Sequence, residues 1–164
     1  MRPNAPPIST QMDTFIALSR AYVALTAQAA EVLRPYGLSL SKYNVLRIMR
    51  GQGGRLPSGE IGARMVWPSS DLTRLLDGLE QAGLIQRERD TADRRVVHIQ
   101  LTAEAGRLLK SLDAPMEKLH AQQFRRLSSR ELDDLLGILD HLGGFARSAQ
   151  PGELDGQLSR SRKR

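Results

Sequence analysis

The residues with the clearest capacity for chemistry lie between positions 69 and 77, where polar groups alternate with leucines. Four leucines recur at the spacing of one helical face, namely Leu72, Leu75, Leu76 and Leu79. The polar side chains that accompany this stripe are Ser69, Ser70, Asp71, Thr73, Arg74 and Asp77. Arg74 has the reach and the donors for guanine O6 and N7 or for a phosphate, and the hydroxyls can hold phosphates or touch a thymine methyl. The carboxylates can accept from cytosine N4 or pair with Arg74. An ordinary amphipathic helix with a solvated side would show the same pattern.

A second polar cluster, rich in arginine, lies between two runs that favour β-strands, 84–89 and 96–101. In the second run Val97, Ile99 and Leu101 alternate with polar residues, which is typical of a half-buried strand. The segment 87–95 holds four arginines against three acids. The pattern predicts a hairpin with a charged tip. The alternative is a surface ladder of ion pairs, in which Asp90 and Asp93 neutralise the arginines and little stability results.

Both clusters need elements that hold them in place. Ser69 or Ser70 can cap a helix that continues to Gly83, where a left-handed residue would end it. Upstream, Ser58 can cap a shorter helix. Helix, turn, helix and arginine-tipped hairpin together predict a winged helix-turn-helix over 39–102, which is a unit that reads DNA.

Two stretches of this unit resemble the MarR family of bacterial transcription regulators. Residues 72–85, Leu-Thr-Arg-Leu-Leu-Asp-x-Leu-Glu-x-x-Gly-Leu-Ile, are similar to the family's recognition helix. Residues 93–106, Asp-Arg-Arg-Val-x-x-Ile-x-Leu-Thr-x-x-x-Gly, are similar to its wing and the return into the next helix. The likeness follows the element order from 12 to 147, and its motifs lie between 58 and 106.

The resemblance assigns roles within the wing. Arg95 matches the family arginine that enters the minor groove, where negative potential is concentrated, and Asp93 matches the acid that braces it. The arginines expected to assist at phosphates are Arg87, Arg89 and Arg94. This chain has uncharged residues where relatives often carry basic ones, namely Gly78, Gln81 and Ala82. That departure predicts weaker or more selective DNA binding.

Leucine-rich segments, 10–34 and 103–147, flank the DNA-reading unit and are expected to be helical. Pro115 is expected to kink or divide the second segment, and Ser128 with Glu131 forms a capping box. One subunit offers too little core to cover these segments, so we expect them to interlock with a second copy in a two-fold homodimer, as similar relatives do. Such a homodimer reads a pseudo-palindromic operator, with its recognition helices about one DNA turn apart.

Length and composition fit one globular domain. The pattern of expected elements predicts a mainly α fold with a small antiparallel β-wing, covering 10–147, between a flexible arm (1–9) and a disordered basic tail (148–164). Of the net charge of +6, residues 160–164 carry four positive charges, which leaves 6 − 4 = +2 for the remainder. Overall charge is therefore weak evidence for DNA binding. The absence of cysteine excludes disulfides and a cysteine peroxide sensor. No apolar run is long enough to span a membrane, which fits a cytoplasmic protein.

The aromatic residues raise the question of a small ligand. In relatives, small aromatic acids bind where the first helices meet the long one, so the expected ligand-binding residues are Tyr22, Tyr36, Tyr43 and Trp67. Core packing explains each of them as well. The histidines lack metal-ligand spacing, and the chain carries none of the common nucleophile, phosphate-loop or metalloprotease motifs. We therefore expect no cofactor, no metal and no catalytic residue.

Together these observations predict a sequence-specific, double-stranded DNA-binding transcriptional regulator. It is expected to be a homodimeric repressor that a small phenolic or aromatic ligand releases from DNA. The alternative is a winged-helix module that binds an acidic protein partner without specific DNA binding. An enzyme finds no supporting residues in this sequence.

Overall fold

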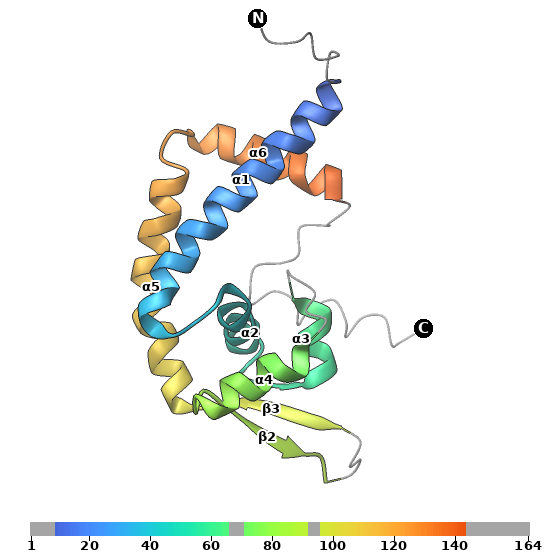
Figure 1. Cartoon of the computed structure of the whole chain (residues 1–164), viewed down its shortest axis with the longest axis vertical. Coiled ribbons are helices and arrows are strands. Elements are labelled where there is room, and N and C mark those ends of the chain that lie inside the picture. The colour runs from blue at the N-terminus through green and yellow to red at the C-terminus, as the bar shows by residue number, and fades with distance from the viewer. Residues whose placement is uncertain (1–8, 66–70, 92–95, 144–164) are drawn as a thin grey trace, which may run out of the picture.

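The computed structural model describes residues 9–65, 71–91 and 96–143, and Figure 1 shows their arrangement. Most of these residues are helical. The helices are α1 (Thr10–Leu33), the short 3₁₀ helix η1 (Arg34–Tyr36), α2 (Leu40–Gly51), α3 (Ser58–Arg64), α4 (Leu72–Gln81), α5 (Ala103–Gln123) and α6 (Ser129–Gly143). The strands are β1 (Arg55–Pro57), β2 (Ile85–Arg89) and β3 (Val97–Leu101). The predicted class, mainly α with a small antiparallel wing, is confirmed.

The sheet contains the predicted hairpin and one strand that the sequence analysis missed. Its strand order is β1-β3-β2, with β3 antiparallel to both neighbours. β2 pairs with β3 from Ile85 opposite Leu101 to Arg89 opposite Val97. β1 has only three residues and ends in Pro57, which an edge strand tolerates because an edge N–H is not needed by the sheet. Three residues are too few to show the alternation of polar and apolar residues that indicates a strand, so the sequence did not predict β1.

Capping residues differ from expectation at two helices. Asp71, and neither Ser69 nor Ser70, caps α4, because an Asp71 side-chain oxygen accepts from the Arg74 backbone N–H at 3.0 Å. Ser58 lies inside α3 and does not cap it, since the residue before the helix is Pro57.

The predicted capping box after α5 is confirmed. The backbone N–H of Ser128 donates to the Glu131 carboxylate at 2.8 Å, and the backbone N–H of Glu131 donates to the Ser128 hydroxyl at 3.3 Å. The Ser128 backbone N–H and hydroxyl lower the pKa of Glu131 because both stabilise its charged form. The box therefore fixes the point at which the chain turns into α6.

The core lies where α2 meets α3, α4, the sheet, the C-terminal part of α1 and the first half of α5. The fully buried side chains at its centre are Leu33, Val45, Leu46, Met49, Ile61, Leu79, Ile85, Ile99, Leu109 and Leu112. Gly62 lets α3 approach α4 closely, because a Cβ there would lie 3.2 Å from a methyl group of Leu72. This core holds α4 and the β2–β3 hairpin side by side at the lower end of the molecule in Figure 1.

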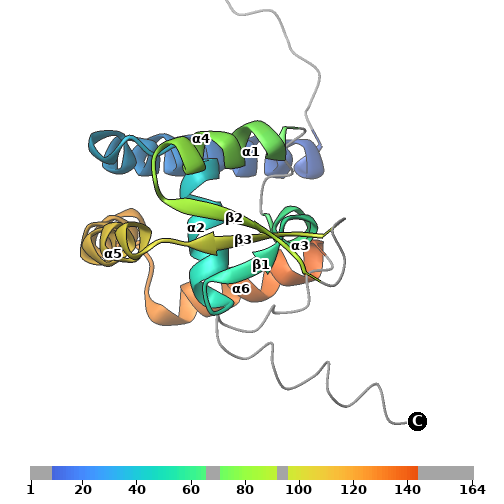
Figure 2. The same ribbon diagram turned by 90° about the horizontal axis from the view of Figure 1, so that it is seen from below.

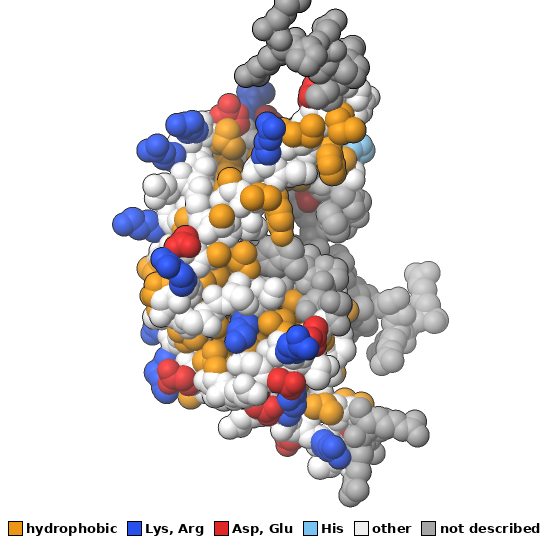
Figure 3. Space-filling model, viewed as in Figure 1, with side chains coloured by type: hydrophobic (Ala, Val, Ile, Leu, Met, Phe, Trp, Pro, Cys, Tyr) orange, Lys and Arg blue, Asp and Glu red, His pale blue; other side chains and the backbone are white. Residues whose placement is uncertain are grey.

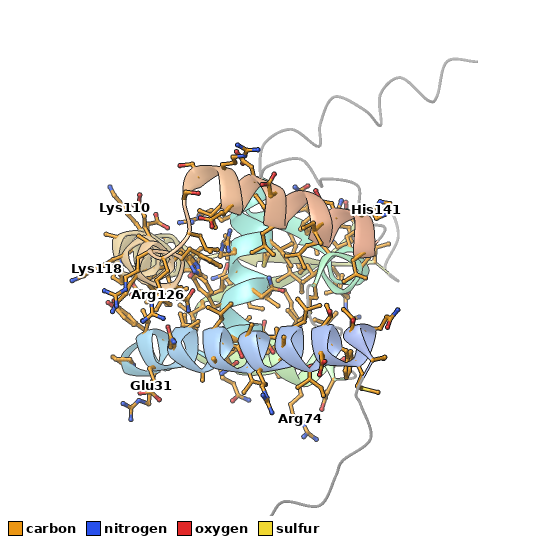
Figure 4. The ribbon with its side chains drawn as sticks, turned by 90° about the horizontal axis from the view of Figure 1, so that it is seen from above. Glu31, Arg74, Lys110, Lys118, Arg126 and His141 are labelled. Atoms are coloured by element: carbon orange, nitrogen blue, oxygen red, sulfur yellow. The ribbon has the colours of Figure 1, made fainter. Side chains whose placement is uncertain are left out.

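The long helices at the other end are poorly covered by the chain itself. α1 buries only Ala29 and Leu33, and among the described side chains of α6 none is buried. Figures 1 and 4 show that α1 and α6 cross in one projection but run separately in the other. In Figure 3 hydrophobic side chains are visible along α1. The hydrophobic residues that remain exposed on these two helices are Met12, Phe15, Tyr22, Val23, Leu136, Ile138, Leu139 and Leu142.

Pro115 does not divide α5, which continues as one helix from Ala103 to Gln123. Buried side chains anchor it on both sides of the proline, Leu109 and Leu112 before it and Met116 after it. Burial of this kind outweighs the hydrogen bond that a proline removes from a helix. None of the helices described by the structure is long and apolar enough to cross a membrane.

Candidate nucleic-acid interface

Helix α4 buries one face and exposes the other, as its leucine spacing predicts. Leu76 and Leu79 are buried, whereas Thr73 and Arg74 are exposed. The left-handed conformation expected after this helix occurs at Gly83, which has φ 69°. Figure 2 shows α4 lying beside the hairpin of β2 and β3. The exposed face and the hairpin therefore present their polar groups to the same region of solvent.

Arg74 is the most accessible cation on this face, with 87% of its side chain exposed. Its Nε lies 2.9 Å from a carboxylate oxygen of Asp71, whose other oxygen caps the helix. Neither terminal Nη group of Arg74 has a partner among the described residues, and Figure 4 shows the side chain extending away from the body of the protein. Asp71 therefore orients Arg74 through its Nε and leaves the two Nη groups of Arg74 available. Two parallel N–H donors of this kind suit bidentate binding to guanine or phosphate.

Arg87 lies on β2 and joins the wing to α4. One Nη group lies 2.6 Å from Asp77 and the other 2.7 Å from Glu80, and a weaker contact of 3.4 Å reaches the Thr73 carbonyl oxygen. The backbone N–H of Arg87 donates to Glu80 as well, at 3.3 Å. Only 28% of the Arg87 side chain is exposed. Asp77 thus pairs with Arg87, while the alternative pairing with Arg74 is taken by Asp71.

This network sets the orientation of the recognition helix relative to the wing. Two helix carboxylates meet one guanidinium from the neighbouring strand, and the pairs are partly shielded from water. Ion pairs that are partly buried and share a guanidinium hold geometry better than exposed single pairs. The sequence predicts that Arg87 binds phosphates, and that role stays a prediction. Its observed contacts make it a brace between β2 and α4.

We predict that Arg87→Gln lowers the free energy of unfolding by about 1–2 kcal/mol, because two carboxylates lose their shared partner in a half-buried place. Urea unfolding followed by circular dichroism measures this difference. Arg89→Gln is the matched control, because Arg89 lies two residues away on the same strand and is exposed. Equal urea midpoints of unfolding for Arg87→Gln and the wild type would show that the ion pairs of Arg87 with Asp77 and Glu80 add no stability.

The base of the wing contains a pair that the sequence analysis did not single out. The Nε2 atom of His98 lies 2.9 Å from a carboxylate oxygen of Asp90, and the Asp90 backbone N–H donates to the Val96 carbonyl at 3.0 Å. The Nδ1 atom of His98 is buried and has no hydrogen-bond partner among the residues that the structure describes. The tautomer with hydrogen on Nε2 satisfies this arrangement, because Nε2–H then donates to Asp90. The pair closes the hairpin just before its tip.

Several predicted DNA-binding residues lie outside the described residues. They are Ser69, Ser70, Asp93, Arg94 and Arg95. Arg89 is described and exposed at the end of β2. The structure therefore brings together Asp71, Thr73, Arg74, Asp77 and Arg87. Arg89 is the last residue of β2, where the wing tip begins.

The predicted ligand-binding tyrosines differ in their surroundings. Tyr22 on α1 is 50% exposed and Tyr36 is 37% exposed, whereas Tyr43 on α2 is buried with the Arg47 guanidinium carbon 5.9 Å from its ring centre. Burial raises the pKa of the Tyr43 phenol, and the positive charges of Arg47 and Arg50 partly oppose this rise. The fourth predicted residue, Trp67, lies outside the described residues.

A cavity of about 280 Å³ lies elsewhere, between α1 and the end of α5. Its lining is polar and consists of Gln28, Gln122, Gln123, Arg125 and Arg126. None of the predicted tyrosines contributes to it.

Comparisons with known proteins agree with this geometry. Residues 38–97 match the sequence profile of the MarR family. The regulator MhqR of Bacillus subtilis is 28% identical over 129 residues, which cover 79% of this chain and 88% of that protein. A MarR transcription factor from Planctomyces limnophilus, known from a crystal structure, is 31% identical, with a TM-score of 0.64 and coverage of 83% of this chain and 98% of that one.

A third comparison concerns the fold. An organohalide-sensing transcriptional regulator in its 2,4-dichlorophenol-bound form superposes with a TM-score of 0.80 at 16% identity, covering 88% of each chain. The family profile spans α2 to the start of β3, which includes α4 and the Arg87 brace, and the 31% identical relative extends the match over most of the chain. The chain belongs to the MarR family and is a DNA-binding transcriptional regulator, not an enzyme.

Proposed function

We propose that this protein is a homodimeric repressor that places α4 of each subunit in successive major grooves and each wing in a flanking minor groove. The observation that carries the proposal is the open guanidinium of Arg74, oriented by Asp71 on a helix whose other face is buried. The proposed DNA contacts are Ser69, Ser70, Asp71, Thr73, Arg74, Asp77, Arg87, Arg89, Asp93, Arg94 and Arg95. Base contacts by Arg74 would specify sequence, and the other arginines would mainly position the protein on phosphates.

The exposed apolar faces of α1 and α6 support the homodimer. Leu142 and Phe15 are each 67% exposed, and a helix such as α6 with no buried side chain in its own subunit gains little from folding alone. Apolar surface of this extent is stabilised by burial, at about 25 cal/mol per Å². We assign 10–34 and 103–147 to dimerisation and 39–102 to DNA reading.

We further propose that a small phenolic or aromatic ligand weakens DNA binding. The structural neighbour crystallised with 2,4-dichlorophenol supports a ligand of this class. The exposed Tyr22 and Tyr36 offer aromatic surface for it. We keep Tyr43 and Trp67 as the other proposed ligand-binding residues. The ligand must bind more tightly to a state whose two recognition helices are badly spaced for DNA, since a ligand with equal affinity for both states shifts nothing.

A gel-shift titration with the DNA that flanks the protein's own gene tests this function. We expect one shifted species and an affinity that falls steeply with salt, with a slope of log affinity against log salt near −0.9 for each phosphate neutralised. Repeating the titration with phenolic and aromatic acids should identify a compound that reduces binding. Equal affinity for this DNA and for unrelated DNA would favour the interaction-module alternative.

A further inference from the structure

Besides Arg87, a second cation lies against α4: Lys42 of α2, beside Gly78. If Gly78 carried a Cβ, that atom would lie 3.1 Å from the Lys42 Nζ and 3.2 Å from its Cε. Lys42 lies in the first turn of α2, where its backbone N–H donates to the Ser39 hydroxyl at 3.2 Å. Figure 2 shows α2 running steeply across α4 with one end close to it. The Lys42 side chain therefore passes over the recognition helix at the one position that lacks a side chain.

A glycine at position 78, inside α4, lowers the stability of the helix relative to alanine, because the unfolded chain loses more backbone freedom when it folds. Its presence there therefore calls for a structural explanation. Its φ is not positive, so no turn geometry demands it. What its small size provides is room for the lysine ammonium, since an ordinary side chain would displace it.

Gly78 lies four residues after Arg74, which places the two positions next to each other on the surface of the helix. The ammonium of Lys42 thus lies beside the helix one turn after the position of Arg74. From Asp71 to Ala82 this segment holds three acids and the single cation Arg74, a net charge of 1 − 3 = −2. Arg87 offsets Asp77 and Glu80 on one flank, and Lys42 contributes a positive charge on the other.

Lys42 is only partly exposed, and its ammonium forms no ion pair or hydrogen bond within the described residues. A partly desolvated ammonium without an acceptor is stabilised when an anion arrives. We infer that Lys42 binds a DNA phosphate beside the recognition helix, and that Gly78 is the opening through which it reaches this phosphate. The inference rests on the proposed function and adds a DNA contact from outside the helix-turn-helix pair and the wing.

The test compares salt dependence of DNA binding for Lys42→Ala, Lys42→Met and wild type. Each lost phosphate contact should reduce the salt slope by about one, hence by about two in a homodimer. Affinity near 0.1 M salt should fall on the order of 10- to 100-fold. The order of preference among DNA sequences should not change, because phosphate contacts carry no sequence information. Lys110→Met is the matched control, because Lys110 is an exposed lysine on another helix, α5, as Figure 4 shows.

A rescue variant separates loss of charge from damage to packing. Lys42→Ala combined with Gly78→Lys returns one cation to the same flank, and we expect most of the salt slope to return. Wild-type slopes in both single variants would overturn the inference, as would an altered sequence preference. If wild-type protein showed no preference for its flanking DNA, the proposed function itself would fail, so the two failures are distinguishable.

Discussion

Replacing Leu136 and Leu142 by aspartate will leave the protein monomeric and abolish tight operator binding. Both side chains are more than half exposed in the single subunit, at 51% and 67%, so the subunit's own core loses nothing. Two carboxylates per subunit would be desolvated in the apolar contact between copies, which is strongly unfavourable. A monomer reads one half-site, and losing the linked second site should lower operator affinity by about 100- to 10,000-fold.

Sedimentation velocity measures the first effect, with the wild type expected at twice the 18.2 kDa of one chain. Gly137→Asp with His141→Asp is the control, because it adds the same two carboxylates to the opposite face of α6, where Gly137 has nothing within 4 Å of an added Cβ. Circular dichroism should show folded helices in both variants. A leucine variant that sediments as the wild type does would exclude α6 from the dimer contact.

Arg74→Ala should reduce operator affinity by about 1–3 kcal/mol per subunit, because it removes the open guanidinium from the centre of the exposed face of α4. Its effect on stability should be small, since the ion pair with Asp71 is 87% exposed on the arginine side. Asp71 still caps the helix through the backbone N–H of residue 74. Fluorescence anisotropy with labelled operator DNA measures the loss.

Two further variants sharpen this experiment. Arg34→Ala removes an arginine that is also exposed and also paired with an acid three residues earlier, Glu31. Arg34 is the first residue of η1, directly after α1, so DNA affinity should not change. Arg74→Lys keeps the positive charge but removes the two parallel N–H donors of the guanidinium. If Arg74 binds guanine, lysine should weaken sequence discrimination more than the salt slope. Unchanged operator affinity in Arg74→Ala would remove Arg74 from the proposed interface.

The elements that carry the interface were predictable from sequence because their signals are local. The leucine spacing of 72–79, the glycine at 83 and the alternation of 97–101 each depend on neighbouring residues, and each occurs as predicted. The cap of α4 was misassigned because Ser69, Ser70 and Asp71 are all good capping residues in adjacent positions. Only the backbone conformation decides which of their side chains accepts a hydrogen bond from the first backbone N–H groups of the helix.

The fold class and the exposed face of α4 were determined by the sequence alone, through patterns that repeat every two or every three to four residues. The family was indicated by the resemblance of residues 72–85 and 93–106 to its motifs. Tertiary structure decided the partners of the charges. Arg87 meets Asp77 and Glu80 because β2 folds back against α4, and Lys42 meets Gly78 because α2 crosses that helix from a distant part of the chain. Such contacts depend on how elements pack, and packing is set by the whole core, so spacing along the chain does not encode them.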